Sequence, residues 1–119
     1  MELKVKGRLP GLNDYIAAER TNRYKAASMK REAEALVLWS AKASLRGKIP
    51  TPCIMHYRWT EPNRKRDKDN ISSFGRKVIQ DALVKGGYLP GDGWNHITGF
   101  TDEFEVGDPQ ITVTFEEVT

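Results

Sequence analysis

Residues 53–60 read CIMHYRWT, a run of β-branched, aromatic and sulfur-containing side chains between Pro52 and Pro62. Such side chains favour the pleated, half-buried surface of a sheet. We therefore predict a central β-strand over these residues. The strand leads into residues 64–70, RKRDKDN, in which four cations surround two carboxylates that lie two positions apart. A buried strand would thus deliver a dense group of charges to one end of the sheet.

The apolar residues that follow Asn70 recur at helical spacing and predict a main helix. They are Ile71, Phe74, Val78, Ala82 and Leu83. Lys85 and the two glycines after it are typical of a helix end. The helix therefore begins beside Asp67 and Asp69.

Hydrophobic periodicity and glycine or proline breakers predict the remaining elements. They are a strand over 2–8, a short helix over 12–19 capped by Asn13, a long main helix from about 24 to 45, and strands over 97–106 and 110–118. We expect residues 107–109 to form a hairpin turn between the last two strands. This order predicts an α/β (α+β) fold, in which residues 1–119 form a single small domain. Its mixed sheet of about four strands would pack against two main helices.

Length and composition exclude several classes of protein. The longest unbroken apolar run, residues 35–39, has five residues, whereas a bilayer span needs about 18. We therefore expect no membrane segment. The first residues, MELKVK, lack the apolar region of a signal peptide, so we expect a cytoplasmic location. Cys53 is the only cysteine, which rules out an internal disulfide and a zinc cluster built from thiolates.

The charge is unevenly distributed along the chain. The net charge is +3, yet residues 102–119 contain six acidic residues and no Lys or Arg. Two cationic clusters lie in the remainder, which predicts a nucleic-acid-binding face. Alternatively, each cluster is only a solvated surface. The clusters are Arg20, Arg23, Lys25, Lys30 and Arg31, and Arg64, Lys65, Arg66 and Lys68.

Asp67 and Asp69 are candidate ligands for a hard divalent cation. In extended backbone, residues i and i+2 point to the same side, so both carboxylates would share one ion. The ion would relieve their mutual repulsion. Alternatively, Asp69 caps the helix that starts at Asn70, and Asp67 is a solvated turn residue.

Asp92 is the candidate third carboxylate, because the loop after the helix can return to the rim of the sheet. Alternatively, it forms an ordinary turn with Gly93. Lys77, near the middle of the helix, would project toward the same site and stabilise charge on a reacting phosphate. Alternatively, Lys77 pairs with Asp81 one helical turn later.

Other chemistries have less support. His56 and His96 lack metal-ligand spacing, and we interpret both as strand histidines. Cys53 is interpreted as an inert core thiol. The aromatic residues could include one that stacks on a base, although most are expected in the core. They are Tyr57, Trp59, Phe74, Tyr88 and Trp94.

Three segments, RDKDN at 66–70, KVIQDAL at 77–83 and KGGYL at 85–89 leading to Asp92, resemble the RusA-type Holliday junction resolvases of phages and prophages. The resemblance spans most of the chain. It implies a homodimeric endonuclease that depends on Mg²⁺, with Mn²⁺ as an alternative, and makes paired nicks in four-way DNA junctions during recombination and repair. It also implies a catalytic acidic triad formed by Asp67, Asp69 and Asp92.

The family's functional lysine has two candidate positions in this sequence. Counted back from Asp81 it falls on Lys77, whereas counted forward from Asp69 it falls on Ser73. The difference arises because about four extra residues, one helical turn, separate the two motifs. The family's basic residue before the acidic pair falls on Arg66. Two other functions remain open: a non-catalytic nucleic-acid-binding protein, and a nuclease for flaps or other branched DNA.

Overall fold

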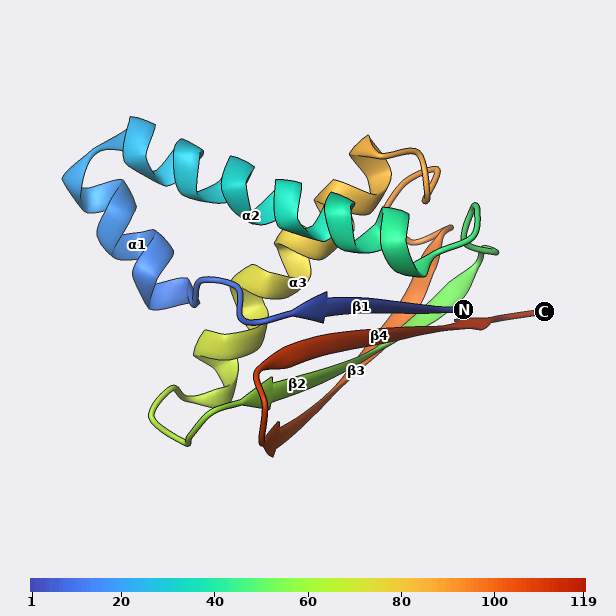
Figure 1. Ribbon diagram of the computed structural model, residues 1–119. Coiled ribbons are helices and arrows are strands. Elements are labelled where there is room, and N and C mark those ends of the chain that lie inside the picture. The colour runs from blue at the N-terminus through green and yellow to red at the C-terminus, as the bar shows by residue number, and fades with distance from the viewer.

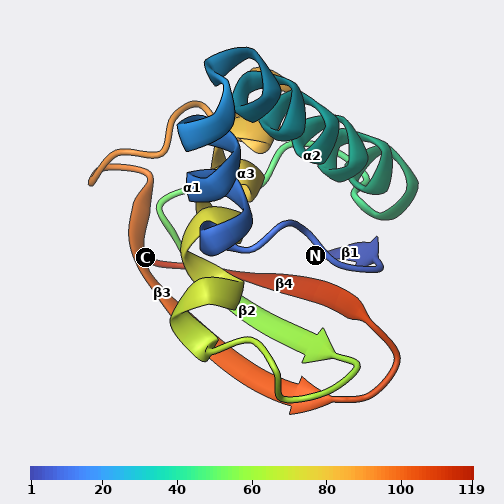
Figure 2. The same ribbon diagram turned by 90° about the vertical axis from the view of Figure 1, so that its left-hand side faces the viewer.

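A four-stranded mixed sheet carries three helices on one face, as the computed structural model of residues 1–119 shows (Figure 1). Figure 2 shows all three helices on the same side of the sheet. This confirms the predicted fold class. The predicted short helix packs on the same face of the sheet as the two main helices. No helix has the length and apolar character that crossing a membrane requires. The elements are β1 (Glu2–Lys6), α1 (Leu12–Thr21), α2 (Arg23–Ser44), β2 (Cys53–Glu61), α3 (Lys68–Lys85), β3 (Ile97–Val106) and β4 (Gln110–Glu117).

The strand order is β1-β4-β2-β3, so β2 is a central strand as predicted. It pairs antiparallel with β4 and parallel with β3, and α3 forms the crossover between the two parallel strands. The predicted hairpin at residues 107–109 is wrong, because β2 lies between β3 and β4. The segment instead passes the end of β2, where the amide of Gly107 donates to the carbonyl of Glu61 at 2.9 Å.

The core lies between the sheet and the helices. Met55, Tyr57 and Trp59 alternate along β2 and are almost completely buried against the helical layer. The predicted apolar residues of α3 are buried there too. His56 and Arg58 point to the opposite face, which no helix covers. Period-2 burial on β2 and helical burial on α3 therefore fix how the crossover packs.

Gly75 allows α3 to approach β2 closely. A Cβ atom on this residue would lie 2.7 and 2.8 Å from two ring atoms of Trp59. The indole is held in place, since its N–H donates to Asp102 on β3 at 2.8 Å. The absence of a side chain at Gly75 therefore sets the spacing of helix and sheet.

We predict that Gly75→Ala lowers the free energy of unfolding by about 1–2 kcal/mol, because the strain of the overpacked methyl outweighs the gain in helix propensity. Urea unfolding followed by tryptophan fluorescence measures the change. Gly47→Ala is the matched control, since its Cβ would meet nothing within 4 Å. Equal stability of Gly75→Ala and the wild type would show that the contact with Trp59 relaxes without cost.

Candidate functional site

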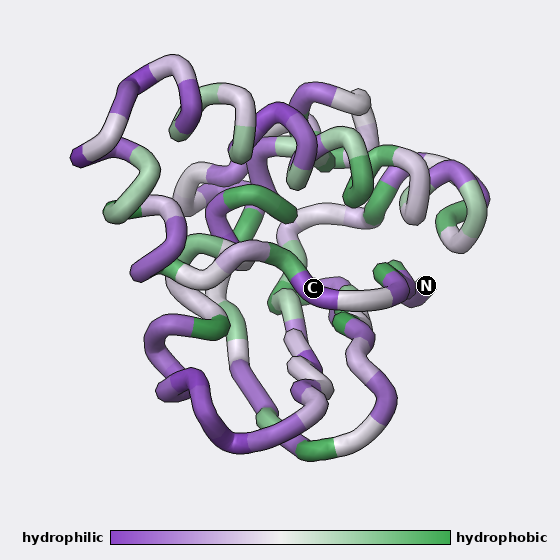
Figure 3. Tube along the Cα trace, turned by 60° about the vertical axis from the view of Figure 1, so that its left-hand side comes forward, coloured by the Kyte–Doolittle hydropathy of each residue, from purple (hydrophilic) through white to green (hydrophobic).

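The connection from β2 to α3 lies at the end of the sheet and is hydrophilic throughout (Figure 3). It borders a hollow of about 630 Å³ whose lining includes Asp67, Arg64, Lys68 and, from β3, Phe104 and Val106. We call this the Asp67 hollow. The strand therefore delivers a carboxylate and two cations to one concave surface.

Asp67 occupies the N-cap position of α3, which begins two residues earlier than predicted. A capping aspartate usually accepts hydrogen bonds from the first turn, but the Asp67 side chain makes none. It also takes part in no ion pair shorter than 4.0 Å. The alternative in which Asp69 caps the helix is wrong, because Asp67 occupies that position, whereas the exposed and unbonded Asp67 carboxylate fits both a solvated residue and a ligand that awaits a cation.

Asp69 lies in the first turn of α3, so the pair does not have the extended backbone that we expected. One of its carboxylate oxygens accepts a hydrogen bond from the Ser73 hydroxyl at 2.8 Å. Asp69 does not belong to the lining of the Asp67 hollow. Ser73, one candidate for the family's lysine position, thus lies beside the acidic pair.

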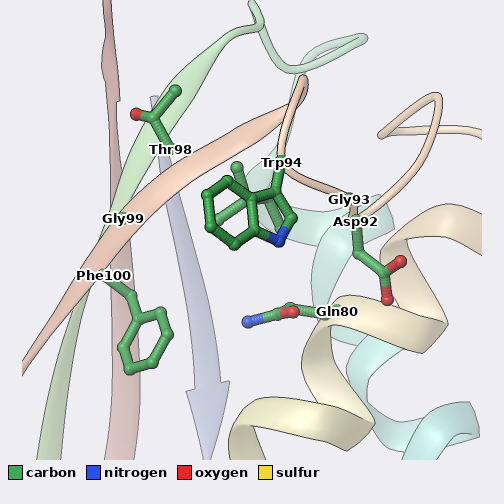
Figure 4. Close-up of a pocket in the computed structure, with 8 residues that line it drawn as sticks. Gln80, Asp92, Gly93, Trp94, Thr98, Gly99 and Phe100 are labelled. Carbon is green, nitrogen blue, oxygen red and sulfur yellow. The ribbon is translucent and has the colours of Figure 1, made fainter.

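Asp92 lies beside a second hollow, of about 480 Å³, which we call the Trp94 hollow (Figure 4). The Lys77 ammonium is 3.8 Å from Asp92 and 3.2 Å from Asp81, so both interpretations of this lysine describe contacts that it makes. Burial by itself would raise the pKa of Asp81, but Lys30 and Lys77 outweigh it and hold that pKa below its usual value. Lys77, the other candidate for the lysine position, thus lies beside the loop acid.

Within one chain the three predicted ligands do not form a metal site. No group of three His, Cys, Asp or Glu side chains lies close enough to hold an ion. Ten residues of α3 separate Asp67 from Lys77, the neighbour of Asp92, which corresponds to about 15 Å along the helix. A Mg²⁺ ion takes six oxygen ligands close to it, so the single chain does not fit the predicted triad.

The two cationic clusters lie at the end of the molecule opposite the chain termini (Figure 1). Most of their side chains are exposed and free to meet a polyanion. Lys30 differs, because it pairs with Asp81 at 3.0 Å. The exposed members are Arg20, Arg23, Lys25, Arg31, Arg64, Lys65 and Lys68.

Arg66 belongs to a partly buried ion cluster with Glu61 and Arg8. Its guanidinium and that of Arg8 each approach Glu61 at 2.9 Å, and Arg66 also donates to the carbonyl of Leu9. Burial would raise the pKa of Glu61, but the hydrogen bonds and charges of Arg66 and Arg8 outweigh it and hold the pKa below its usual value. Arg66 therefore anchors the loop that carries Asp67.

The sequence patterns did not identify Glu61 and Phe100 as candidates for a functional role. Glu61 ends a buried strand beside a basic segment, and an acid in that position signals an ion pair. Phe100 is half exposed on β3 with the Arg76 guanidinium 4.6 Å from its ring centre, and no sequence pattern marks it.

The other aromatic residues, Cys53 and the two histidines occupy different environments. Tyr57, Trp59 and Phe74 are core residues, whereas Trp94 is 95% exposed. Cys53 is a buried thiol whose pKa is raised by burial, as expected for an inert cysteine. His56 lies on β2, but His96 lies in the turn before β3, so its assignment to a strand is wrong.

No family model matches the chain, and the comparison with curated proteins finds no relative.

We predict that Glu61→Gln lowers the free energy of unfolding at pH 7 by about 2–3 kcal/mol, because two guanidinium groups lose their charged partner. Since the folded state lowers the Glu61 pKa, this stabilisation is complete above the unfolded value of 4.5 and is lost as pH falls through the folded value. The difference in the free energy of unfolding between Glu61→Gln and the wild type should therefore be smaller at pH 3 than at pH 7.

Urea unfolding at pH 7 and pH 3 measures both effects. Glu103→Gln is the control, because its pair with Arg58 is exposed and should contribute little. A Glu61→Gln protein as stable as the wild type at pH 7 would contradict the anchoring role of the cluster.

Proposed function

We propose that this protein is a metal-dependent endonuclease that cleaves branched DNA, with the four-way junction as its substrate and a second copy as its partner. The observation that carries the proposal is the uncommitted carboxylate of Asp67 in a hollow flanked by Arg64 and Lys68. We also propose that the protein acts in the cytoplasm, in DNA recombination and repair.

The surrounding charges favour a phosphodiester over a neutral substrate. Exposed cations on the β2–α3 loop and around the junction of α1 and α2 would bind the DNA backbone. Release of counterions from the DNA would drive this binding. A bare carboxylate beside a phosphate is repelled by it, whereas a carboxylate with a divalent cation is attracted. Asp67 therefore suits a metal-dependent cleavage site better than a site for binding alone.

Magnesium is the proposed cofactor, with manganese as the alternative. When bound, such an ion would polarise a phosphoryl oxygen or activate water. Asp67 and Asp69 lie at the N-terminal end of α3. Lys77 lies farther along the helix, where it contacts Asp92 of the loop that follows. The preference for a four-way junction comes from the resemblance of the RDKDN and KVIQDAL segments to the RusA-type resolvases.

We predict that Asp67→Asn lowers the cleavage rate of a synthetic four-way junction by about 100-fold or more, because a metal ligand is lost. Junction binding should be kept or tightened, since repulsion of the phosphates decreases. Glu2→Gln is the control, because this exposed acid lies on β1, at the edge of the sheet opposite β3, and should change neither quantity. Unchanged cleavage by Asp67→Asn would refute the site.

Substrate preference separates the rival functions. A four-way junction, a flap and a linear duplex are incubated with wild-type protein in Mg²⁺, with and without chelator. Paired symmetric nicks confined to the junction support a resolvase. Faster cleavage of the flap would favour a nuclease for other branched DNA, and binding without any cleavage would favour the non-catalytic protein.

We predict that the double substitution Arg64→Ala and Lys65→Ala weakens binding to all DNA sequences and reduces the slope of log Kd against log salt by about 2. Arg58→Ala is the matched control, because this exposed arginine lies on the sheet face away from the helices. Fluorescence anisotropy over a salt series measures the slopes. Equal slopes for the double variant and Arg58→Ala would exclude the loop from the DNA interface.

A further inference from the structure

The two partial sites lie beside opposite ends of one strand. The Asp67 hollow is lined by Phe104, Glu105 and Val106 from the last residues of β3. The Trp94 hollow, which includes Asp92, is lined by residues 97–100 from the first residues of the same strand. Strand β3 therefore connects the hollow of Asp67 to the hollow of Asp92 along the edge of the sheet.

This edge is long and open. Strand β3 has ten residues, pairs only with β2, and contains neither the lysine nor the proline that often protects an edge. Large apolar side chains are exposed along it: Phe100 is 50% exposed, Val106 is 53% exposed and Trp94, just before the strand, is 95% exposed. The combination is typical of a surface that pairs with another strand.

We propose that two copies of the chain pair antiparallel through their β3 edges about a two-fold axis, and that each site combines Asp67 and Asp69 of one copy with Asp92 and Lys77 of the other. Antiparallel pairing reverses the strand direction. It therefore places the beginning of one β3 strand beside the end of the other, and both sites form at once. The metal-binding role of the combined acids rests on the proposed function, whereas the pairing does not.

Shape and charge at the two ends of β3 are complementary. The Asp67 hollow presents the apolar side chains of Ile71, Phe104 and Val106 together with Arg64 and Lys68. The other end of the strand presents an exposed indole, Trp94, and a carboxylate, Asp92. The indole of Trp94 fits the apolar part of this hollow, and its cations attract the carboxylate of Asp92, while Glu61, Asp67 and Glu105 add negative charge to the same lining.

The middle of the strand also permits pairing with itself. Two of its acidic residues already have cationic partners, Asp102 with Arg76 and Glu103 with Arg58. Repulsion between the copies is therefore reduced near the axis. Phe100 lies close to the middle of the strand, where two-fold symmetry would bring it near its own copy.

Mixing two inactive variants tests the shared site. Asp67→Asn and Asp92→Asn should each abolish junction cleavage alone. After subunit exchange the mixture should regain about a quarter of wild-type activity, because about half of the dimers are mixed and each has one intact site. If each site came from a single chain, every site in the mixture would lack one acid and no activity would return.

A mixture of Asp67→Asn with Asp69→Asn is the matched control. Both substitutions affect the same half of the site, so this mixture should remain inactive. An Asp67→Asn and Asp92→Asn mixture no more active than this control overturns the proposal. All three residues are exposed, and melting curves check that the variants are folded.

Cross-linking gives a readout that does not depend on cleavage. Gly93→Cys and Arg64→Cys proteins are mixed and treated with a short bismaleimide. A covalent dimer should form in the mixture and in neither protein alone, while the buried Cys53 keeps the wild type unlinked. Absence of the dimer overturns the pairing, and if the wild type cleaves no DNA while the dimer forms, only the proposed function fails.

Discussion

The parallel pairing of β2 with β3 is the constraint on which the rest of the structure depends. Two adjacent parallel strands need a crossover, and here α3 supplies it by running back along the whole length of β2. The residues before the helix and the loop after it therefore lie at different distances along the sheet. Asp67 is placed at the C-terminal end of β2, and Asp92 is placed near the start of β3.

The helix can take this path because its contacts with β2 are specific. Gly75 lets the backbone approach Trp59, and the Trp59 indole is bonded to Asp102, which also pairs with Arg76 of α3. The buried Trp59 of β2 therefore contacts both α3 and the edge strand β3. At the end of β2, Glu61 joins Arg8 and Arg66 and fixes the start of the loop. Asp67 follows Arg66 directly, so this cluster positions the backbone that carries the Asp67 carboxylate.

Local patterns in the sequence predicted most of the elements, and the reasons are physical. The apolar spacing of α3 and the β-prone run of β2 reflect burial on one face, which periodicity records directly. The pairing of β3 with β2 depends on contacts between segments more than 40 residues apart, so short-range turn signals at residues 107–109 misled the prediction of a hairpin. The charged loop was recognised, but the sequence could not show that Arg66 turns inward to Glu61. That choice depends on where Arg8 and the end of β2 lie in space.

Under the proposed function, a crossover helix that separates Asp67 from Asp92 would restrict cleavage by a single chain. Within one chain no three His, Cys, Asp or Glu side chains could hold a metal ion, so the proposed cleavage of DNA would require the second copy. Pairing through β3 would create two equivalent sites in the same step, related by a two-fold axis. A four-way junction has comparable symmetry, and two cuts placed by that axis would be paired without any further signal between the subunits. Relative to the RusA-type resolvases that the sequence resembles, the additional turn between the two motifs would lengthen the distance between the acidic pair and Lys77 within a chain. It need not disturb a site in which Lys77 accompanies Asp92 from the other copy.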